Sequence, residues 1–520
     1  MYFYQALQRN ATIFSNNIGT SFGDRERTWK EVEQRVAKLA GALVEHGVGQ
    51  ENHVAILAMN SDRYFEYYNA IPWIGGIVVP LNIRWSIKEN IYSLENSQSS
   101  VLFVDDAFLE MGKELAKQCK NIQVIIYMGD GETPAGMHNY EQLIESANAI
   151  TPVKNDYNNL AGIFYTGGTT GFPKGVMLSH TNLWSSSIVV TAEMGLNVAG
   201  ERYLHAAPMF HLADVGVSYA MVIGGLCQVF IPYFEATSVI EAIEHKKVNH
   251  VLLVPTMVTM MLATPALDNA NFSSLKHIIY GASPMPEGTL IAAMEKMSSV
   301  QFIQAYGQSE LSPVISILPA EYHVLEGPNA GKLRSAGRAG YCVRVEIRDE
   351  NGKVLPTGEV GEIAASGPNT MLGYWNNTEQ TAATLIDGWV LTGDAGYMDE
   401  DGFIFLVDRL KDMIVTGGEN VFSAEVENAL SHHPAIQESV VLGIPSEQWG
   451  EAVHAIIRLN EQQEITDEEV FKHCREYIAG YKIPQSIEIR AEAFPITGAG
   501  KIMKNELRAP YWIHETRAIN

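Results

Sequence analysis

Short apolar runs of strand length alternate with helix-compatible segments along much of the chain, and this alternation constrains the fold more than any other feature. Runs of this length, bounded by turn residues, are typical of buried strands. Strands separated by helices favour a layered α/β architecture, and ligand-binding loops then follow the carboxyl ends of the strands. The predicted strands are residues 54–58, 76–81, 101–104, 124–127, 161–165, 251–254, 277–280 and 302–305.

Capping patterns predict where several helices begin. Thr28 and Glu31 have the spacing of a capping box, and apolar residues recur at helical spacing after them. Thr466 and Glu469 form a second such pair, and Ser423 is predicted to cap a short helix. Strands are predicted on either side of residue 450, so the C-terminal part contains both element types.

The length of the chain, 520 residues, indicates more than one hydrophobic core. Residues 340–373 consist of short, glycine-punctuated runs that favour a β-rich subdomain. Beyond Asp408 the remaining residues can form a separate α+β domain. We therefore predict a large N-terminal domain of layered α/β subdomains plus the β-rich subdomain over residues 1–408. A small, mobile α+β C-terminal domain is predicted over residues 409–520.

Composition excludes several classes of protein. The formal charge of −24, from 36 Lys+Arg against 60 Asp+Glu, argues against a general nucleic-acid-binding surface. Four cysteines with no C-x-x-C pair fit a reducing compartment and argue against a disulfide framework or a zinc site. Because no run of eighteen apolar residues and no signal-peptide pattern is present, we expect no transmembrane segment and a cytoplasmic location.

A glycine- and threonine-rich run, Tyr-Thr-Gly-Gly-Thr-Thr-Gly-Phe-Pro-Lys-Gly, occupies residues 165–175 directly after a predicted strand. Its glycines let backbone N–H groups approach an anion, its threonines add hydroxyl donors and its lysine adds positive charge. The run therefore predicts a cradle for a triphosphate or pyrophosphate, although its spacing is not that of a Walker A loop. The candidate ligands are Thr166, Gly167, Gly168, Thr169, Thr170, Gly171 and Lys174.

With this loop the chain resembles the adenylate-forming superfamily of acyl-CoA synthetases, adenylation domains and firefly-type luciferases. The superfamily more usually has Ser where this chain has Gly167, which removes one hydroxyl donor. Six further motifs resemble those of the superfamily in the same order, and the resemblance covers essentially the whole chain. They are Ala-Pro-Met-Phe-His at 207–211, Gln-Ala-Tyr-Gly-Gln-Ser-Glu at 304–310, Asp-Gly-Trp-Val-Leu-Thr-Gly-Asp at 387–394, Asp-Arg-Leu-Lys-Asp at 408–412, Gly-Gly-Glu-Asn at 417–420 and Pro-Ile-Thr-Gly-Ala-Gly-Lys-Ile at 495–502.

The resemblance implies a role for each motif. Tyr306 is expected to flank adenine, Glu310 to hold Mg²⁺ on the ATP phosphates, and Asp394 to bind the ribose hydroxyls. His211 is expected beside the carboxylate of the acid. Lys501 is expected to contact that carboxylate and the α-phosphate, where it offsets developing charge. Further nucleotide contacts are implied for Gly281, Ala282, Gly307, Ser309 and Arg409.

The resemblance also implies two half-reactions with a domain rotation between them. The acid first attacks ATP to form acyl-AMP and pyrophosphate, and coenzyme A then takes the acyl group and releases AMP. The C-terminal domain is expected to turn about the hinge Lys411. One orientation presents Lys501, and the other presents the pantetheine-tunnel residues Gly417, Gly418 and Glu419. The expected ligands are a carboxylic acid, ATP, Mg²⁺ and coenzyme A.

The acid is harder to predict. Met257, Met260 and Met261 fall in segments expected near the acyl pocket, and methionines adapt to flexible apolar chains, although they can equally pack the core. They favour a medium- or long-chain fatty acid, with an aryl or other short acid as the alternative. A stand-alone enzyme that loads a carrier protein, a luciferase-like monooxygenase and a non-catalytic sensor are rival functions. A homodimer and peripheral membrane contact also remain open.

Overall fold

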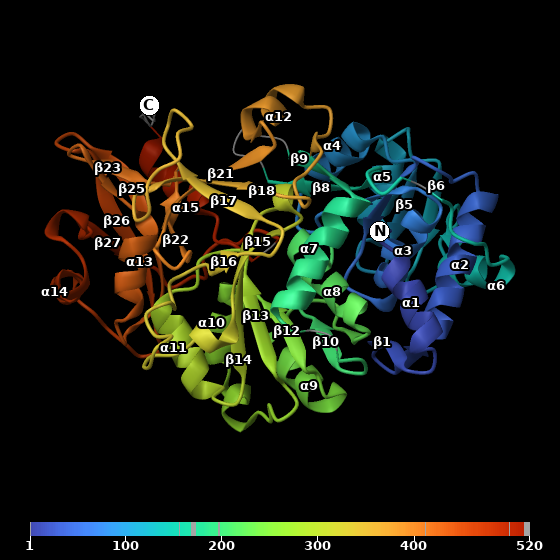
Figure 1. Ribbon diagram of the computed structural model, residues 1–520, viewed down its shortest axis with the longest axis horizontal. Coiled ribbons are helices and arrows are strands. Elements are labelled where there is room, and N and C mark those ends of the chain that lie inside the picture. Colours follow the sequence, from blue (N-terminus) through green and yellow to red (C-terminus); the bar gives the residue numbers. More distant parts are fainter. Residues whose placement is uncertain are drawn as a thin grey trace.

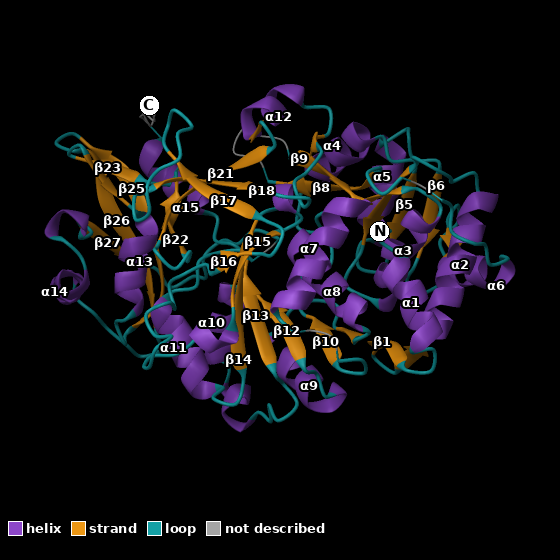
Figure 2. Cartoon of the chain, viewed as in Figure 1, coloured by secondary structure: helices purple, strands orange, loops and turns teal. Residues whose placement is uncertain are grey.

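The computed structural model describes residues 2–154, 156–167, 173–195, 198–410, 412–498 and 500–513. A large N-terminal domain and a small C-terminal domain make up the chain, as predicted. The ribbon places the N-terminus on the right and the orange-to-red C-terminal domain on the left (Figure 1). Helices cover the faces of both large sheets, which confirms the layered α/β class (Figure 2).

The first large sheet has eight strands, and all of its pairings are parallel except the two at one edge, β19 with β9 and β9 with β8. Its central strands are apolar along their whole length because both faces are buried. In spatial order it runs β19 (Gly373–Tyr374), β9 (Lys174–Ser179), β8 (Leu160–Thr166), β4 (Ile77–Pro80), β3 (His53–Leu57), β5 (Val101–Val104), β6 (Val124–Tyr127) and β7 (His138–Asn139).

The second large sheet has nine strands, and it is parallel through its centre and antiparallel at both edges. The carboxyl ends of its parallel strands open toward the C-terminal domain. In spatial order it runs β16 (Arg338–Ala339), β15 (Val314–Leu318), β14 (Gln301–Gly307), β13 (His277–Gly281), β12 (His250–Leu253), β10 (Arg202–His205), β11 (Cys227–Phe230), β1 (Ile18–Phe22) and β2 (Arg25–Thr28).

Two helices lie between these sheets, α7 (His180–Glu193) and α8 (Leu212–Gly224) (Figure 1). Nearly every residue of α8 is buried, and its opposite sides join two hydrophobic cores. A helix that is apolar on all sides is expected in such a position. The other helices of the N-terminal domain are α1 (Gln5–Ile13), α2 (Trp29–Glu45), α3 (Asp62–Trp73), α4 (Ile87–Ser97), α5 (Leu109–Gln118), α6 (Tyr140–Ser146), α9 (Ala236–Lys246), α10 (Pro255–Ala263), α11 (Glu287–Lys296) and α12 (Thr378–Thr384).

The β-rich subdomain is a five-stranded antiparallel sheet that extends beyond the predicted residues 340–373, because three of its strands follow residue 373. It lies above the junction of the two large sheets (Figure 1). Its strands are β17 (Arg344–Arg348), β18 (Gly361–Ser366), β21 (Trp389–Met398), β20 (Leu385–Ile386) and β22 (Ile404–Arg409).

The C-terminal domain has its own five-stranded sheet and its own apolar core. Its strands are β24 (Glu419–Val421), β23 (Ile414–Thr416), β26 (Gly450–Leu459), β25 (Ile436–Ser446) and β27 (Ser486–Ile489). Its helices are α13 (Ser423–Ser431), α14 (Asp467–Tyr477) and α15 (Lys504–Arg508).

Both predicted capping boxes are confirmed, at Thr28 before α2 and at Thr466 before α14. The prediction for Ser423 was wrong in detail, because Ser423 is the first residue of α13 and makes no capping hydrogen bond. Its hydroxyl instead accepts a hydrogen bond from Lys504 Nζ at 2.6 Å. The Ser423 hydroxyl is therefore bound by the partly buried Lys504 and does not cap the helix.

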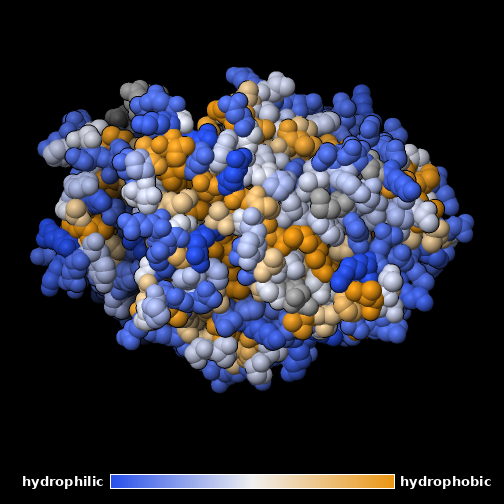
Figure 3. Space-filling model, in the orientation of Figure 1, coloured by the Kyte–Doolittle hydropathy of each residue, from blue (hydrophilic) through white to orange (hydrophobic). Residues whose placement is uncertain are grey.

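The cysteines are unpaired, and Cys342 is the exposed member of the four. Within the ranges described above, no helix is both long and apolar enough to cross a membrane. Apolar side chains gather near the middle of the face in Figure 3, while its outer parts are mainly hydrophilic.

Candidate active site

A cavity of about 1250 Å³ lies between the two domains. Loops that follow β4, β8, β10, β12, β13 and β14 line it, so it lies at the carboxyl ends of the parallel strands of both large sheets. Open α/β sheets bind ligands at this edge. The C-terminal domain closes the cavity with residues on either side of Lys501.

Most of the predicted site residues line this one cavity, although they come from seven separated parts of the chain. The lining includes Thr166, Gly167, His211, Gly281, Ala282, Tyr306, Gly307, Ser309, Glu310, Asp394, Arg409 and Lys501. The predicted residues Gly168, Thr169, Thr170, Gly171 and Lys411 lie outside the described residues.

His211 stands at the start of α8 and caps it. Its Nδ1 accepts a hydrogen bond from the Ala213 N–H at 3.3 Å, so the ring proton is on Nε2. Burial, with the positive charge of Lys501 nearby, lowers the pKa of His211 to about 3. The ring is therefore neutral near pH 7, and its Nε2–H can donate a hydrogen bond to a carboxylate in the cavity.

Glu310 lies in a short 3₁₀ turn after β14, and Tyr374 fixes its carboxylate. The Tyr374 hydroxyl donates to Glu310 Oε1 at 2.7 Å, and Lys174 Nζ lies 5.4 Å from the centroid of the Tyr374 ring. Lys174 therefore contacts the ring of the residue that fixes Glu310, although Lys174 does not line the cavity. Sequence reasoning missed Tyr374 because nothing local to it indicates a partner 64 residues away.

The donor set at Glu310 fits a Mg²⁺ ion bound largely by phosphate oxygens. Carboxylate oxygen is a hard ligand, and Tyr374 occupies one lone pair of one of its oxygens. No group of three or more acidic, His or Cys side chains that could hold a metal occurs among the described residues. Magnesium sites on nucleotides commonly use one or two carboxylates, so a larger group is not needed.

Asp394 on β21 is buried and has a partner for each carboxylate oxygen. The Tyr306 hydroxyl donates to Oδ2 at 2.9 Å, and Arg409 Nε lies 3.2 Å from Oδ1. Antiparallel pairing of β21 with β22 sets Arg409 directly opposite Asp394. Burial, followed by the charge of Asp394, raises the pKa of Tyr306, so this hydroxyl stays a donor. Each carboxylate oxygen keeps a lone pair for a ribose hydroxyl.

The turn after β13 brings backbone into close contact with β14. A Cβ on Gly281 would lie 2.1 Å from the Ala305 carbonyl oxygen, so the position requires glycine. Ala282 follows with φ of 70°, a conformation that residues other than glycine seldom adopt. Strained backbone of this kind is concentrated at ligand sites.

The C-terminal domain is docked against α11 through backbone groups. The Glu287 N–H donates to Asn428 Oδ1 at 3.1 Å, and the Gly288 N–H donates to Ser431 Oγ at 3.4 Å. A Cβ on Gly288 would lie 2.3 Å from the Ser431 carbonyl oxygen. The two domains are therefore in direct contact in the orientation that brings Lys501 into the cavity.

Two groups of predicted residues lie elsewhere. Gly417, Gly418 and Glu419 form the turn between β23 and β24, where the Gly417 N–H donates to the Trp449 carbonyl at 2.9 Å, and none of them lines the cavity. Of the two interpretations that the sequence left open for the methionines, the structure supports packing in the core for Met257 and Met261. Met257 and Met261 are buried in the core behind α10, and Met260 is 49% exposed. The α10 residues that line the cavity are Pro255, Thr256, Thr259, Leu262 and Ala263.

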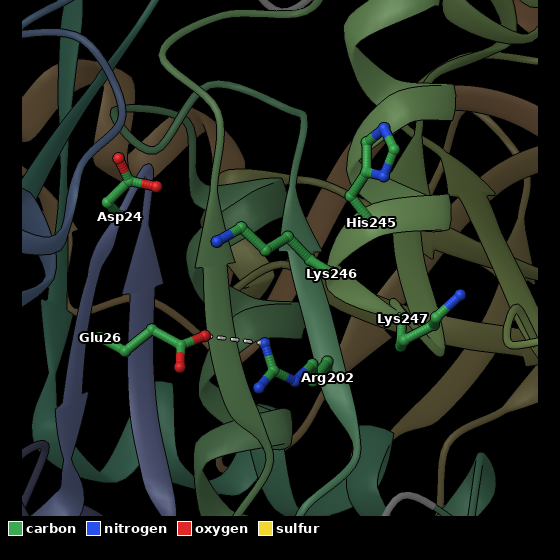
Figure 4. A pocket seen from close by; sticks show the side chains of 6 residues that line it. All are labelled: Asp24, Glu26, Arg202, His245, Lys246 and Lys247. Atoms are coloured by element: carbon green, nitrogen blue, oxygen red, sulfur yellow. Dashed lines mark hydrogen bonds and ion pairs between the residues drawn. The ribbon is translucent and has the colours of Figure 1, made fainter.

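A second, polar cavity of about 520 Å³ lies near the amino ends of the strands of the nine-stranded sheet (Figure 4). Three of its charged side chains, Glu26, Arg202 and Lys246, have partners within the protein. Arg202 Nη1 lies 3.2 Å from Glu26 Oε1, and Lys246 Nζ donates to the Gly23 carbonyl at 2.6 Å. Because this cavity is remote from the strand edge that binds ligands, the interdomain cavity is the candidate active site.

Comparison with known proteins agrees with this geometry. The family model "AMP-binding enzyme" matches residues 5–375, and "AMP-binding enzyme C-terminal domain" matches residues 425–501. The chain belongs to the AMP-binding enzyme family. Its relatives place the chain in the acid:CoA ligase branch of the adenylate-forming superfamily. The chain is an enzyme of the AMP-forming acyl-CoA synthetase type.

Its relatives differ in their acids. A feruloyl-CoA synthase from Amycolatopsis sp is 35% identical over 501 residues, which cover 96% of this chain and 97% of the relative. A fatty acid–[acyl-carrier-protein] ligase, ScoC, from Streptomyces coeruleorubidus is 31% identical over 500 residues, covering 95% and 94%. The solved structure of the anthranilate CoA ligase AuaEII with anthranoyl-AMP superposes with a TM-score of 0.91 at 25% identity, covering 98% and 97%.

Proposed function

We propose that this AMP-binding enzyme activates a carboxylic acid with ATP and transfers the acyl group to coenzyme A. The observation that carries the proposal is the convergence of Lys501, from the C-terminal domain, with Glu310, Asp394 and His211 in one cavity. Lys501 supplies a cation, Glu310 a hard oxygen ligand, Asp394 a hydrogen-bond acceptor for the ribose diol, and His211 a neutral hydrogen-bond donor. Together they match the chemical needs of acyl-adenylate formation.

In the first half-reaction a carboxylate oxygen attacks the α-phosphorus of ATP, and the bond to the pyrophosphate oxygen breaks. Lys501 would contact both the acid and the α-phosphate and offset the negative charge that accumulates. His211 would orient the carboxylate through its Nε2–H without exchanging a proton. Asp394 would hold the ribose and Tyr306 the purine. Glu310 would hold Mg²⁺, which neutralises charge on the leaving pyrophosphate.

The second half-reaction needs different groups at the same acyl carbon. The thiolate of coenzyme A attacks that carbon, and the bond to AMP breaks. We propose that the C-terminal domain turns about Lys411 and brings the Gly417–Glu419 turn to the cavity. That turn lies outside the cavity in the present orientation, so the rotation has to occur if the turn binds the thiol.

For the acid substrate, we propose a compact aryl acid in preference to a fatty acid. One wall of the cavity consists of small and medium-sized apolar side chains, namely Ala213, Val217, Leu252, Ala305, Pro313 and Val314. A Cβ on Gly216 would lie 2.4 Å from Pro313 Cδ, so α8 packs directly on this wall, which favours a compact acid there. The feruloyl and anthranilate specificities of two relatives support the same choice.

A panel of acids tests the acid and the reaction together. Acid-dependent exchange of labelled pyrophosphate into ATP would be measured for ferulate, anthranilate, benzoate, octanoate and palmitate, without coenzyme A. We expect exchange to be faster with aryl acids than with fatty acids. Faster exchange with palmitate would overturn the aryl proposal and leave the ligase proposal standing.

A carrier protein is the second candidate acceptor, because the relative ScoC is described as an acyl-carrier-protein ligase. The two acceptors are distinguished by supplying purified acyl-AMP with either coenzyme A or a phosphopantetheinylated carrier protein. Preferred acylation of the carrier would show that the thiol is protein-bound.

A further inference from the structure

Several backbone contacts join the described residues of the loop that carries Lys501. Residues Ile496 and Ile502 form a β-bridge, the Thr497 N–H donates to the Lys501 carbonyl at 2.7 Å, and the Lys501 N–H donates to Thr497 Oγ1 at 3.1 Å. The Gly500 N–H also donates to the Thr497 carbonyl at 2.9 Å. Because these contacts join Lys501 to Thr497 and Gly500, the position of Lys501 depends on where the described residues of the loop are docked.

The N-terminal domain contacts this turn from two sides. Thr256, in the first turn of α10, donates from Oγ1 to the Gly500 carbonyl at 2.8 Å. Arg84, between β4 and α4, donates from Nη1 to the Thr497 carbonyl at 3.2 Å. α10 follows a strand of the nine-stranded sheet, whereas Arg84 follows a strand of the eight-stranded sheet. The turn is therefore attached to both large sheets at once.

Close backbone packing accompanies the two hydrogen bonds. A Cβ on Gly498 would lie 2.5 Å from Asn82 Oδ1, and a Cβ on Gly500 would lie 2.7 Å from Val254 Cγ2. Side chains at these positions would hold the turn away from the N-terminal domain. The glycines allow the backbone carbonyls beside them to reach Thr256 and Arg84.

We infer that Thr256 and Arg84 form a two-point clamp that positions Lys501 for adenylate formation and is released before thioester formation. The clamp residues are positioning residues, since they bind the backbone of the turn and act on the reaction through Lys501. The inference rests on the proposed role of Lys501. It adds that the N-terminal domain contributes to the adenylating orientation through these two side chains.

The clamp predicts an effect confined to one half-reaction. Loss of one hydrogen bond typically slows a step that depends on it by about 3- to 10-fold. We expect Thr256→Val, which keeps the shape of the side chain, to slow pyrophosphate exchange about 5-fold. Arg84→Gln should slow it about 3-fold because Arg84 is exposed, and the double variant about 15-fold if the contacts act independently. Thr256→Ser should restore exchange, because it keeps the hydroxyl.

The experiment compares the two half-reactions in the full-length enzyme, with the acid that exchanges fastest in the panel above. Pyrophosphate exchange reports adenylate formation, and AMP release from supplied acyl-AMP plus coenzyme A reports transfer. Thr12→Val and Arg9→Gln, at exposed positions of α1, are matched controls and should leave both steps unchanged.

The outcomes separate the clamp from the proposed function. Slower exchange with transfer within about twofold of the parent supports the clamp, provided that Thr256→Ser recovers. Equal slowing of both steps, or no slowing, overturns it. Lys501→Ala is measured in parallel. If Lys501→Ala leaves exchange intact, the proposed role of Lys501 is contradicted. If Lys501→Ala abolishes exchange while the clamp variants exchange at the parental rate, only the clamp is contradicted.

Discussion

Replacement of Gly288 by alanine should loosen the domain contact that supports adenylate formation. Gly288 lies in the first turn of α11, and its added Cβ would lie 2.3 Å from the carbonyl oxygen and 2.9 Å from the carbonyl carbon of Ser431. These are backbone atoms of α13, so they cannot move aside as a flexible side chain would. The two helices must separate, which also weakens the 3.4 Å hydrogen bond from the Gly288 N–H to Ser431 Oγ.

The size of the effect follows from these contacts. Overpacking typically costs about 1–3 kcal/mol, and a weakened hydrogen bond adds to it. If the cost falls on the docked orientation alone, about 2 kcal/mol slows adenylate formation about 30-fold. Folding of the N-terminal domain should not suffer, because alanine stabilises an exposed helix position relative to glycine by about 0.5–1 kcal/mol.

The assay again measures pyrophosphate exchange and acyl transfer separately, together with thermal unfolding. Gly480→Ala is the matched control, because a Cβ there meets nothing within 4 Å. We expect Gly288→Ala to lose exchange and keep transfer. Equal loss of both steps, or a parental exchange rate, would refute the argument that this contact belongs to the adenylating orientation.

Three further predictions concern the cavity itself. Glu310→Gln should raise the Mg²⁺ concentration needed for half-maximal exchange, because an amide binds a hard cation less well than a carboxylate; an unchanged Mg²⁺ dependence would show that Glu310 is not the ligand. Tyr374→Phe should slow exchange about 3- to 10-fold by freeing the Glu310 carboxylate, and wild-type kinetics would remove Tyr374 from the site. Burial lowers the pKa of His211 to about 3, so between pH 3 and 6.5 the ring binds a proton only in the unfolded chain. The contribution of the neutral His211 ring to the free energy of unfolding is therefore complete above pH 6.5 and is lost as the pH falls. Urea unfolding should therefore show about 1 kcal/mol less destabilisation by His211→Gln at pH 5 than at pH 8, and an equal destabilisation at both values would contradict a neutral ring.

Much of the fold could be predicted because its determinants are local. The strands β5 and β6 are continuous apolar runs between polar segments, and their predicted bounds agree with the structure. The Thr28 and Thr466 capping boxes are complete within four residues of chain. The element types predicted beyond Asp408 are also present, and residues between 414 and 487 form an apolar core of their own.

The contacts that organise the site could not be predicted because they join distant residues. Arg84 reaches a carbonyl 413 residues away, and Thr256 reaches one 244 residues away. Thr256 has no motif of its own, since its importance comes only from its position on the cavity side of α10. The sequence left the role of the methionines of the same helix open, because composition does not reveal which side of a short apolar helix faces a ligand.

The central claim is that the interdomain cavity forms an acyl-adenylate through Lys501. Acid-dependent pyrophosphate exchange by the parent enzyme and by Lys501→Ala, both without coenzyme A, tests it most directly. We predict exchange in the parent and a loss of about 100- to 1000-fold in the variant, with transfer from supplied acyl-AMP largely kept. Exchange that is absent from the parent across the whole acid panel, or equal in both enzymes, would contradict the account.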